Sequence, residues 1–255
     1  MEEIWFKKLV RRRFFAHGAV RRIRFGPLSG KVYRVSDVTG MSPWYSGWER
    51  KQQRAFASVV RAGDVVFDVG AYWGLHTLYL SSLVGAGGRV VAIEPWSRAL
   101  EELEWHINAN HCSNVTVYRG ALSDHCGEGA FVAGHSASTG HLGSEEQGVG
   151  GQSTVRMLTL DAIVGELKIR RLQLVKIDVE GAESAVLRGA AKTLINLRPW
   201  LIVELHTPEQ DVKVAELLIA HDYELKRISG PPIKKLTVGW PDRDGVWGTI
   251  MARPN

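Results

Sequence analysis

Cysteine is scarce in this chain, with only Cys112 and Cys126 among 255 residues. The two do not form a C-x-x-C pair and lie near no histidine cluster with metal-ligand spacing, which argues against a disulfide framework and a zinc site. Apolar runs long enough to cross a bilayer are also absent. Residues 1–24 interleave Arg and Lys with apolar residues, unlike the unbroken apolar stretch of a signal peptide. These absences favour a cytoplasmic protein with reduced thiols.

Positive charge is concentrated at the N-terminus. Residues 1–35 carry ten Lys or Arg and two Glu, a net charge of +8, whereas the whole chain carries +5. We therefore expect a basic N-terminal extension over residues 1–48 and the main domain over 49–255. Because the extension also contains aromatic residues, peripheral contact of residues 1–35 with an anionic membrane surface is one interpretation. Its irregular apolar spacing favours the other, a solvated basic face whose aromatic side chains dock on the domain.

Short apolar runs alternate with helical segments from residue 64 onward. The runs, each expected to be a strand, cover 64–69, 89–93, 115–118, 172–177 and 200–205. Consecutive apolar residues are typical of parallel strands covered on both faces. The tail, residues 223–252, reads as two further strands around a Gly/Pro-rich turn. The sequence thus predicts an α/β fold with an open, doubly wound, mostly parallel seven-stranded sheet of the Rossmann-like type and an antiparallel edge strand.

Helical spacing of apolar residues predicts helices between these strands, one of them over Val186–Leu194. Thr207 and Gln210 have the spacing of a capping box at the start of a later helix. The segment 134–154 breaks the alternation, because it is rich in Gly and Ser and poor in apolar residues. Long segments of this kind are usually functional or disordered, so we expect a mobile loop near the mouth of the site.

A glycine-containing turn follows the first strand of the main domain. Its pattern, D-x-G-x-x-x-G, comprises Asp68, Gly70 and Gly74, with Ala71 directly after the first glycine. Gly70 would let the backbone approach a ligand closely, and Gly74 would let the next helix start tight against the strand. Asp68 provides a carboxylate for a cationic group. The pattern differs from the dinucleotide fingerprint G-x-G-x-x-G, so it favours S-adenosylmethionine over NAD.

Further candidate cofactor residues follow the next strands. Glu94-Pro95 ends the second strand, and a carboxylate there can accept hydrogen bonds from both hydroxyls of an adenosyl ribose. Ala121 and Ser123 follow the third strand, where they would flank the adenine ring. Asp178 follows the fourth strand, where it would orient the methyl donor or the substrate.

These residues, taken together, resemble the FkbM-type methyltransferase family over about 45–206. The segments that carry the resemblance are Phe67-Asp68-Val69-Gly70-Ala71, Glu94-Pro95, Thr159-Leu160-Asp161, Lys176-Ile177-Asp178-Val179-Glu180-Gly181-Ala182-Glu183 and Val203-Glu204-Leu205-His206. The resemblance implies the class I methyltransferase fold, S-adenosylmethionine as cofactor and, most often, O-methylation. The expected acceptor is a hydroxyl of a sugar, glycolipid or other small metabolite.

Methyl transfer from a sulfonium is an in-line displacement, and a hydroxyl acceptor benefits from a base that removes its proton. Alternation along the fifth strand places Glu204 and His206 on one side. His206 is the preferred general base because its ordinary pKa is near neutrality. Alternatively, Asp178, Glu180 and Glu204 together with His206 could hold a hard divalent ion. No ligand spacing specifies an ion, so the sequence predicts no metal site.

Other functions stay open on the sequence alone. The basic extension is compatible with an RNA ribose methyltransferase, whose RNA binding would be sensitive to salt. Base methylation would favour an Asn/Asp-Pro-Pro-aromatic turn after the fourth strand, and Asp178-Val179-Glu180-Gly181 differs from it, so nucleic acid is not the expected partner. A non-catalytic binding module that keeps the fold is the remaining alternative, and the intact turn and acidic strand ends argue against it.

Overall fold

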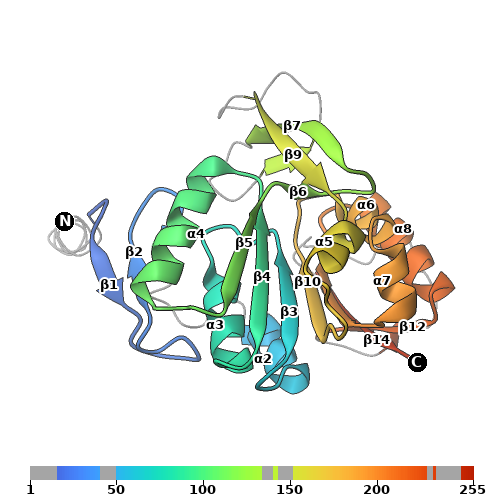
Figure 1. Cartoon of the computed structure of the whole chain (residues 1–255), viewed down its shortest axis with the longest axis horizontal. Helices are drawn as coiled ribbons and strands as arrows, with labels where there is room; N and C mark the ends of the chain where they lie inside the picture. The colour runs from blue at the N-terminus through green and yellow to red at the C-terminus, as the bar shows by residue number, and fades with distance from the viewer. Residues whose placement is uncertain (1–15, 41–49, 134–139, 143–151, 229–231, 234–247) are drawn as a thin grey trace, which may run out of the picture.

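A computed structural model describes residues 16–40, 50–133, 140–142, 152–228, 232–233 and 248–255. Its centre is an eight-stranded sheet with the order β13-β12-β14-β11-β10-β3-β4-β5 (Figure 1). The strands are β3 (Val65–Val69), β4 (Arg89–Glu94), β5 (Val115–Arg119), β10 (Leu174–Ile177), β11 (Trp200–Glu204), β12 (Tyr223–Arg227), β13 (Pro232–Ile233) and β14 (Thr249–Pro254). Each of the five predicted apolar runs forms a strand.

The sheet confirms the predicted fold class. Strands β5, β4, β3, β10 and β11 are parallel, and β14 pairs antiparallel with both β11 and β12. Two details differ from the prediction. The antiparallel strand β14 lies between β11 and β12 instead of at the outer edge, and the short β13 extends the sheet beyond β12.

Helices cover both faces of the sheet (Figure 1). One face carries α2 (Arg50–Val59), α3 (Leu75–Val84) and α4 (Ser97–Ala109), and the other carries α5 (Leu160–Glu166), α6 (Glu183–Arg188), α7 (Ala191–Asn196) and α8 (Pro208–Ala220). Successive strand residues point to opposite faces. Accordingly Val66 packs with Phe56 and Leu78 on the first face. Phe67 packs in the larger core of the second face.

The single helix predicted over Val186–Leu194 is two helices, α6 and α7, separated at Gly189. A Cβ atom at Gly189 would lie 2.0 Å from the carbonyl oxygen of Ser123, so the chain passes too close for a side chain there. Asp161 stabilises the start of α7, because its carboxylate accepts hydrogen bonds from the backbone N–H groups of Lys192 and Thr193 at 2.9 and 2.8 Å. Tertiary packing therefore overrides the helical periodicity.

The predicted helix cap at Thr207 is present, since its hydroxyl accepts a hydrogen bond from Gln210 N at 3.2 Å. In a capping box the Gln210 side chain would accept a hydrogen bond from the Thr207 backbone N–H, but it has a different partner here. The side-chain oxygen of Gln210 accepts from Ser184 N at 2.9 Å, which ties α8 to α6.

A second sheet begins at the carboxyl end of β5. It has the order β6-β9-β7-β8, with β6 (Ala121–Leu122), β7 (Gly127–Ala133), β8 (Gly140–Leu142) and β9 (Gln152–Leu158). These strands were not predicted from the sequence, and β8 and the start of β9 fall within the segment expected to be a loop. The remainder of that segment, residues 134–139 and 143–151, lies outside the described residues.

The described part of the basic extension forms a hairpin that packs on α4. Strands β1 (Val20–Arg22) and β2 (Val32–Arg34) pair antiparallel. Arg34 N donates to His106 Nε2 at 3.0 Å, and the Asn110 side chain exchanges two hydrogen bonds with the Val32 backbone. Tyr33 is buried, whereas Phe25 is 68% exposed. The other aromatic residues of the extension lie outside the described residues: Trp5, Phe6, Phe14 and Phe15 near the N-terminus, and Trp44, Tyr45 and Trp48 within 41–49.

Within the described ranges, no helix combines the length and apolar character that a membrane span requires.

Candidate active site

Four strands end in one row at the carboxyl edge of the central sheet. Neighbouring strands β4, β3, β10 and β11 are in register at Ile93, Val69, Ile177 and Val203. The residues that follow this row are Glu94, Gly70, Asp178 and Glu204. The sheet thus brings together predicted site residues that are far apart in the sequence, at the edge where open α/β sheets bind ligands.

Asp68 lies one row deeper, directly beside Lys176. Its side chain is 0% exposed. Lys176 Nζ lies 3.1 Å from Asp68 Oδ1, and the Thr77 hydroxyl donates to Oδ2 at 2.6 Å. Lys176 also donates to the carbonyl oxygen of Gly70 at 2.7 Å. The cation facing Asp68 is therefore a side chain of the protein. Asp68 contacts the glycine turn through Lys176, which binds both the Asp68 carboxylate and the Gly70 carbonyl oxygen.

The glycines of the turn are required by contacts within the chain. Gly70 has φ +75°, and a Cβ atom there would lie 1.8 Å from the carbonyl oxygen of Asp178. Gly74 has φ +97°, and a Cβ atom there would lie 2.7 Å from Leu103 of α4. The N–H groups of Gly70 and Ala71 both donate to Ile93 O at 3.0 Å. The approach predicted at Gly70 was to a ligand, whereas the groups that approach these glycines in the structure are the residue after β10 and a side chain of α4.

Glu94 ends β4 with a buried carboxylate that is 5% exposed. Oε2 accepts a hydrogen bond from Tyr72 N at 2.8 Å, in the turn after β3. Oε1 accepts one from Trp96 N at 2.9 Å, on the far side of Pro95. Burial raises the pKa of Glu94 to about 7, although these two hydrogen bonds act in the opposite direction. Each carboxylate oxygen can accept more than one hydrogen bond, so the group can also accept from ligand hydroxyls.

The two predicted adenine-side residues, Ala121 and Ser123, belong to β6 and the turn after it. Gly120 N donates to the Glu94 carbonyl oxygen at 3.0 Å, which places the start of β6 beside the end of β4. Ala121 packs with Phe131 in a small apolar cluster. Ser123 N donates to the Leu158 carbonyl oxygen at 2.8 Å. Both residues are buried, and the second sheet holds them in place.

His206 is surrounded by acidic groups just beyond β11. Its Nδ1 lies 2.6 Å from Glu183 Oε1, and Glu183 is 0% exposed. Its Nε2 lies 3.4 Å from Asp178 Oδ1 and 3.6 Å from Glu180 Oε1. Gly181 N donates to the same Glu183 oxygen at 3.0 Å. Glu183 therefore fixes the ring orientation, and Nε2 is the nitrogen that faces the row of strand ends.

The surroundings of His206 change its protonation. Burial lowers the pKa of the imidazole, but the hydrogen bond with Glu183 and the negative charges of Asp178 and Glu180 outweigh it and raise the pKa to about 9. In the ion-free chain the ring is therefore protonated at neutral pH. The general-base hypothesis assumed an ordinary pKa, so it applies only to a state in which Nε2 has lost that proton. Burial also raises the pKa of Glu180, with Asp178 and Glu204 adding to the shift and His206 opposing it.

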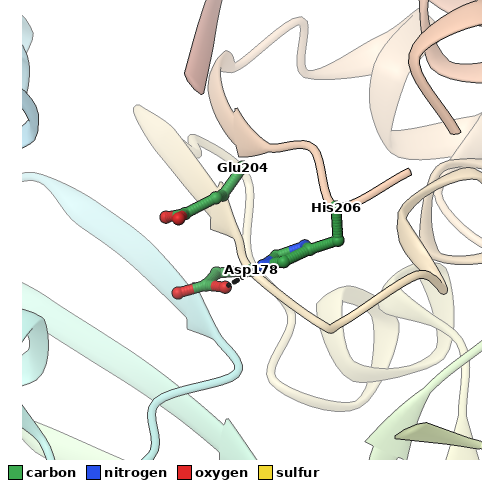
Figure 2. A group of neighbouring side chains, drawn as sticks. All are labelled: Asp178, Glu204 and His206. Atoms are coloured by element: carbon green, nitrogen blue, oxygen red, sulfur yellow. Dashed lines mark ion pairs between the residues drawn. The ribbon is translucent and has the colours of Figure 1, made fainter. Parts of the chain in front are cut away.

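A side chain of α2, Gln52, holds Glu204 in position by a hydrogen bond. Gln52 Nε2 donates to Glu204 Oε2 at 2.7 Å and to Thr249 Oγ1 at 3.1 Å. Ligand atoms of Asp178, Glu204 and His206 lie within 4.8 Å of one another (Figure 2), the arrangement of a candidate metal site. Glu180, which the sequence-based alternative included, is not part of this group.

Sequence reasoning did not assign Gln52 or Glu183 a role. Gln52 could have been noticed as a polar residue four positions before Phe56, on the buried face of its helix. Glu183 is part of the segment that carries the family resemblance. Nothing in the sequence indicated that it would contact His206, because their contact depends on how α6 packs beside the end of β11.

Known proteins share both sequence and fold with this chain. Residues 68–225 match the family model described as the methyltransferase FkbM domain. The hexuronic acid methyltransferase AglP of Haloferax volcanii is 26% identical over 214 residues, which cover 79% of this chain and 82% of AglP.

Two solved structures share the fold. The methyltransferase FkbM from Methylobacillus flagellatus KT has a TM-score of 0.51 at 16% identity, covering 85% of this chain and 52% of that one. Precorrin-6y C5,15-methyltransferase from Geobacter metallireducens GS-15 has a TM-score of 0.51 at 13% identity, covering 82% and 90%.

The family match and the class I methyltransferase sheet agree, and S-adenosylmethionine is the cofactor that they require. Since the family model covers more than half of the sequence, the chain belongs to the FkbM methyltransferase family.

Proposed function

We propose that this methyltransferase transfers the methyl group of S-adenosylmethionine to an oxygen of a small acceptor, a hydroxyl of a sugar or glycolipid. The observation that carries the proposal is the contact of His206 Nε2 with Asp178 Oδ1 at 3.4 Å, next to the turn at Gly70. A group able to handle a proton thus lies beside the expected cofactor turn. The name of the relative AglP, a hexuronic acid methyltransferase, supports a sugar-like acceptor.

The residues at the row of strand ends fit the cofactor. Glu94 is a buried carboxylate with capacity to accept from the ribose hydroxyls, and Pro95 and Ala71 adjoin it. In this proposal Ala121 and Ser123 lie on the adenine side, and Asp178 and Gly70 lie at the methionine end. From the sequence, Asp68 was expected to contact the cofactor and Gly74 to start the helix close to the strand. In this proposal both affect the cofactor only through the turn that they shape, because Asp68 contacts Lys176 and Gly74 contacts Leu103.

When bound, S-adenosylmethionine would supply the methyl carbon of its sulfonium to an acceptor oxygen in line, with the sulfur of S-adenosylhomocysteine as the leaving group. The protein's contribution is to hold the acceptor and take its proton. Nε2 of His206 and Oδ1 of Asp178 face the same space, and we assign proton removal to this pair. Glu183 keeps the ring in place through Nδ1.

The test is methylation of hexoses, hexuronic acids and their glycosides by the purified chain, with detection of S-adenosylhomocysteine and location of the new methyl group by mass spectrometry. We expect transfer to oxygen, and a loss of at least about 100-fold in kcat for His206→Gln, with the Kd for S-adenosylmethionine nearly unchanged. Asp64→Asn, at the opposite end of β3, is the control. Transfer to nitrogen or carbon, or a wild-type rate for His206→Gln, would overturn the proposal.

A further inference from the structure

Acidic groups are concentrated at the site within the described part of the chain. The His206 ring lies between three carboxylates, Asp178, Glu180 and Glu183. Glu204 brings a fourth to the same edge. Lys176 contacts Asp178 at 3.3 Å, but it also faces the buried Asp68 at 3.1 Å. Gathering like charges in a partly buried site is unfavourable unless a counter-charge is bound.

The side chains converge as ligands of one ion would. Figure 2 shows the carboxylates of Glu204 and Asp178 reaching to the same side, with the His206 ring directed at Asp178. One ligand atom of each lies within 4.8 Å of the others. Two atoms bound to one ion at about 2.1 Å are roughly 3 Å apart at right angles and about 4.2 Å apart on opposite sides. Small side-chain rotations are therefore enough to bind an ion.

Two of the three side chains, His206 and Glu204, are also held by a hydrogen bond on the side away from the others. Glu183 binds Nδ1 of His206 at 2.6 Å and leaves Nε2 toward the other two. Gln52 donates to Glu204 at 2.7 Å. A carboxylate or carbonyl on the far nitrogen of a histidine is the usual outer partner of a metal ligand. The Gln52 contact comes from α2, outside the acidic cluster, and the two contacts orient His206 and Glu204 before any ion is bound.

We propose that Asp178, Glu204 and His206 bind one divalent cation of the Mg²⁺ or Mn²⁺ class. Two carboxylates and one imidazole suit a hard ion that keeps open positions for water or a substrate oxygen. With the ion bound, His206 and Asp178 would act as its ligands and would no longer take the proton themselves. If the acceptor is a hydroxyl, as in the proposed function on which this role rests, its oxygen would join the ion and lose its proton more readily, and Glu180, a carboxylate 3.6 Å from Nε2 outside the ligand group, would accept that proton.

The direct test is titration of the chelator-treated full chain with Mn²⁺, followed by electron paramagnetic resonance. We expect one bound Mn²⁺ per chain, displaced by Mg²⁺ in competition. Asp178→Asn and Glu204→Gln should each weaken Mn²⁺ binding at least tenfold, and Gln52→Ala about tenfold. Asp64→Asn is the matched control with unchanged binding. Circular dichroism and thermal unfolding establish that each variant is folded.

Absence of bound Mn²⁺ at millimolar concentration, or binding that Asp178→Asn and Glu204→Gln leave intact in folded protein, would overturn the ion site. The methylation assay separates this result from the proposed function. Bound Mn²⁺ with methylation that persists under a chelator refutes the role of the ion and leaves the O-methyltransferase proposal standing. Bound Mn²⁺ without transfer to any oxygen acceptor refutes the O-methyltransferase proposal and leaves the ion site standing.

Discussion

Binding of S-adenosylmethionine is expected to strengthen as the pH rises through 7, because of Glu94. Burial holds the pKa of this carboxyl at about 7 in the ligand-free chain. The positive charge of Lys176 lowers this pKa and the negative charge of Asp68 raises it. The backbone N–H groups of Trp96 and Tyr72 donate to the carboxylate and also lower the pKa. Ribose hydroxyls donate hydrogen bonds most strongly to the ionised form. The cofactor therefore binds the ionised form of Glu94. At lower pH Glu94 is protonated, so binding includes loss of that proton and is weaker.

The size of the effect follows from that pKa. At pH 6 about one chain in eleven has an ionised Glu94, and at pH 8 about ten in eleven do. If the bound carboxyl titrates near its ordinary pKa of 4.5, the Kd at pH 6 is about tenfold weaker than at pH 8, or about 1.4 kcal/mol. Titration of neighbouring groups changes the Kd of wild type and of Glu94→Gln alike, so the effect of Glu94 is the difference between the two pH dependences.

Calorimetric titration with S-adenosylmethionine between pH 6 and pH 8 measures this dependence. Glu94→Gln should remove it, because an amide does not titrate in this range. At pH 8 the variant should bind about 10- to 100-fold more weakly, since hydrogen bonds to a charged group are replaced by weaker ones. Equal pH dependence in wild type and Glu94→Gln would refute the assignment of Glu94 to the ribose. The cofactor's own titration cancels in this comparison.

Three further predictions concern stability. Burial lowers the pKa of His106 from 6.5 to about 4. The neutral ring therefore contributes about 3 kcal/mol to the free energy of unfolding above pH 6.5, and this contribution is lost as the pH falls toward 4. Urea unfolding at several pH values should show the loss in wild type but not in His106→Gln. Lys176→Met should cost about 3–5 kcal/mol, because it leaves the buried Asp68 charge unpaired, and adding Asp68→Asn should restore much of the loss in thermal unfolding. Gly70→Ala should destabilise far more than Gly63→Ala. Both have positive φ, but only the Gly70 Cβ would meet a neighbouring carbonyl oxygen, at 1.8 Å.

Each of these expectations has a contrary result. Parallel pH profiles for wild type and His106→Gln would mean that His106 has the same pKa in the folded and the unfolded chain. A Lys176→Met variant as stable as wild type would mean that Asp68 is neutral or solvated. Equal losses for the two glycine variants would assign the cost to backbone conformation alone, about 1–2 kcal/mol for a left-handed residue.

Local sequence patterns determined the layered architecture. Apolar runs bounded by helical segments leave few arrangements other than a parallel sheet covered on both faces. Residues placed just after such runs, Glu94 and Asp178 among them, had to meet at the carboxyl edge. The turn at Gly70 was predictable for the same reason, since only a residue without a side chain tolerates so close an approach.

The second sheet shows where local patterns were insufficient. Strand β7 contains Gly127 and Gly129, residues that disfavour strands. A Cβ at Gly129 would lie 2.6 Å from the Met157 sulfur, so glycine leaves room for that side chain where β7 pairs with β9. The packing of Met157 is a tertiary contact, which local patterns do not reveal.

The sequence by itself determined the order of elements, the acidic strand ends and the glycine turn, because these depend on periodicity and on neighbours along the chain. Only the tertiary structure decided which groups face one another. The strand register placed Lys176 beside Asp68. The packing of α6 placed Glu183 on His206, and that of α2 placed Gln52 on Glu204. The charge and protonation of the site follow from these contacts, since electrostatic interactions depend on distance and burial, and residue order along the chain fixes neither.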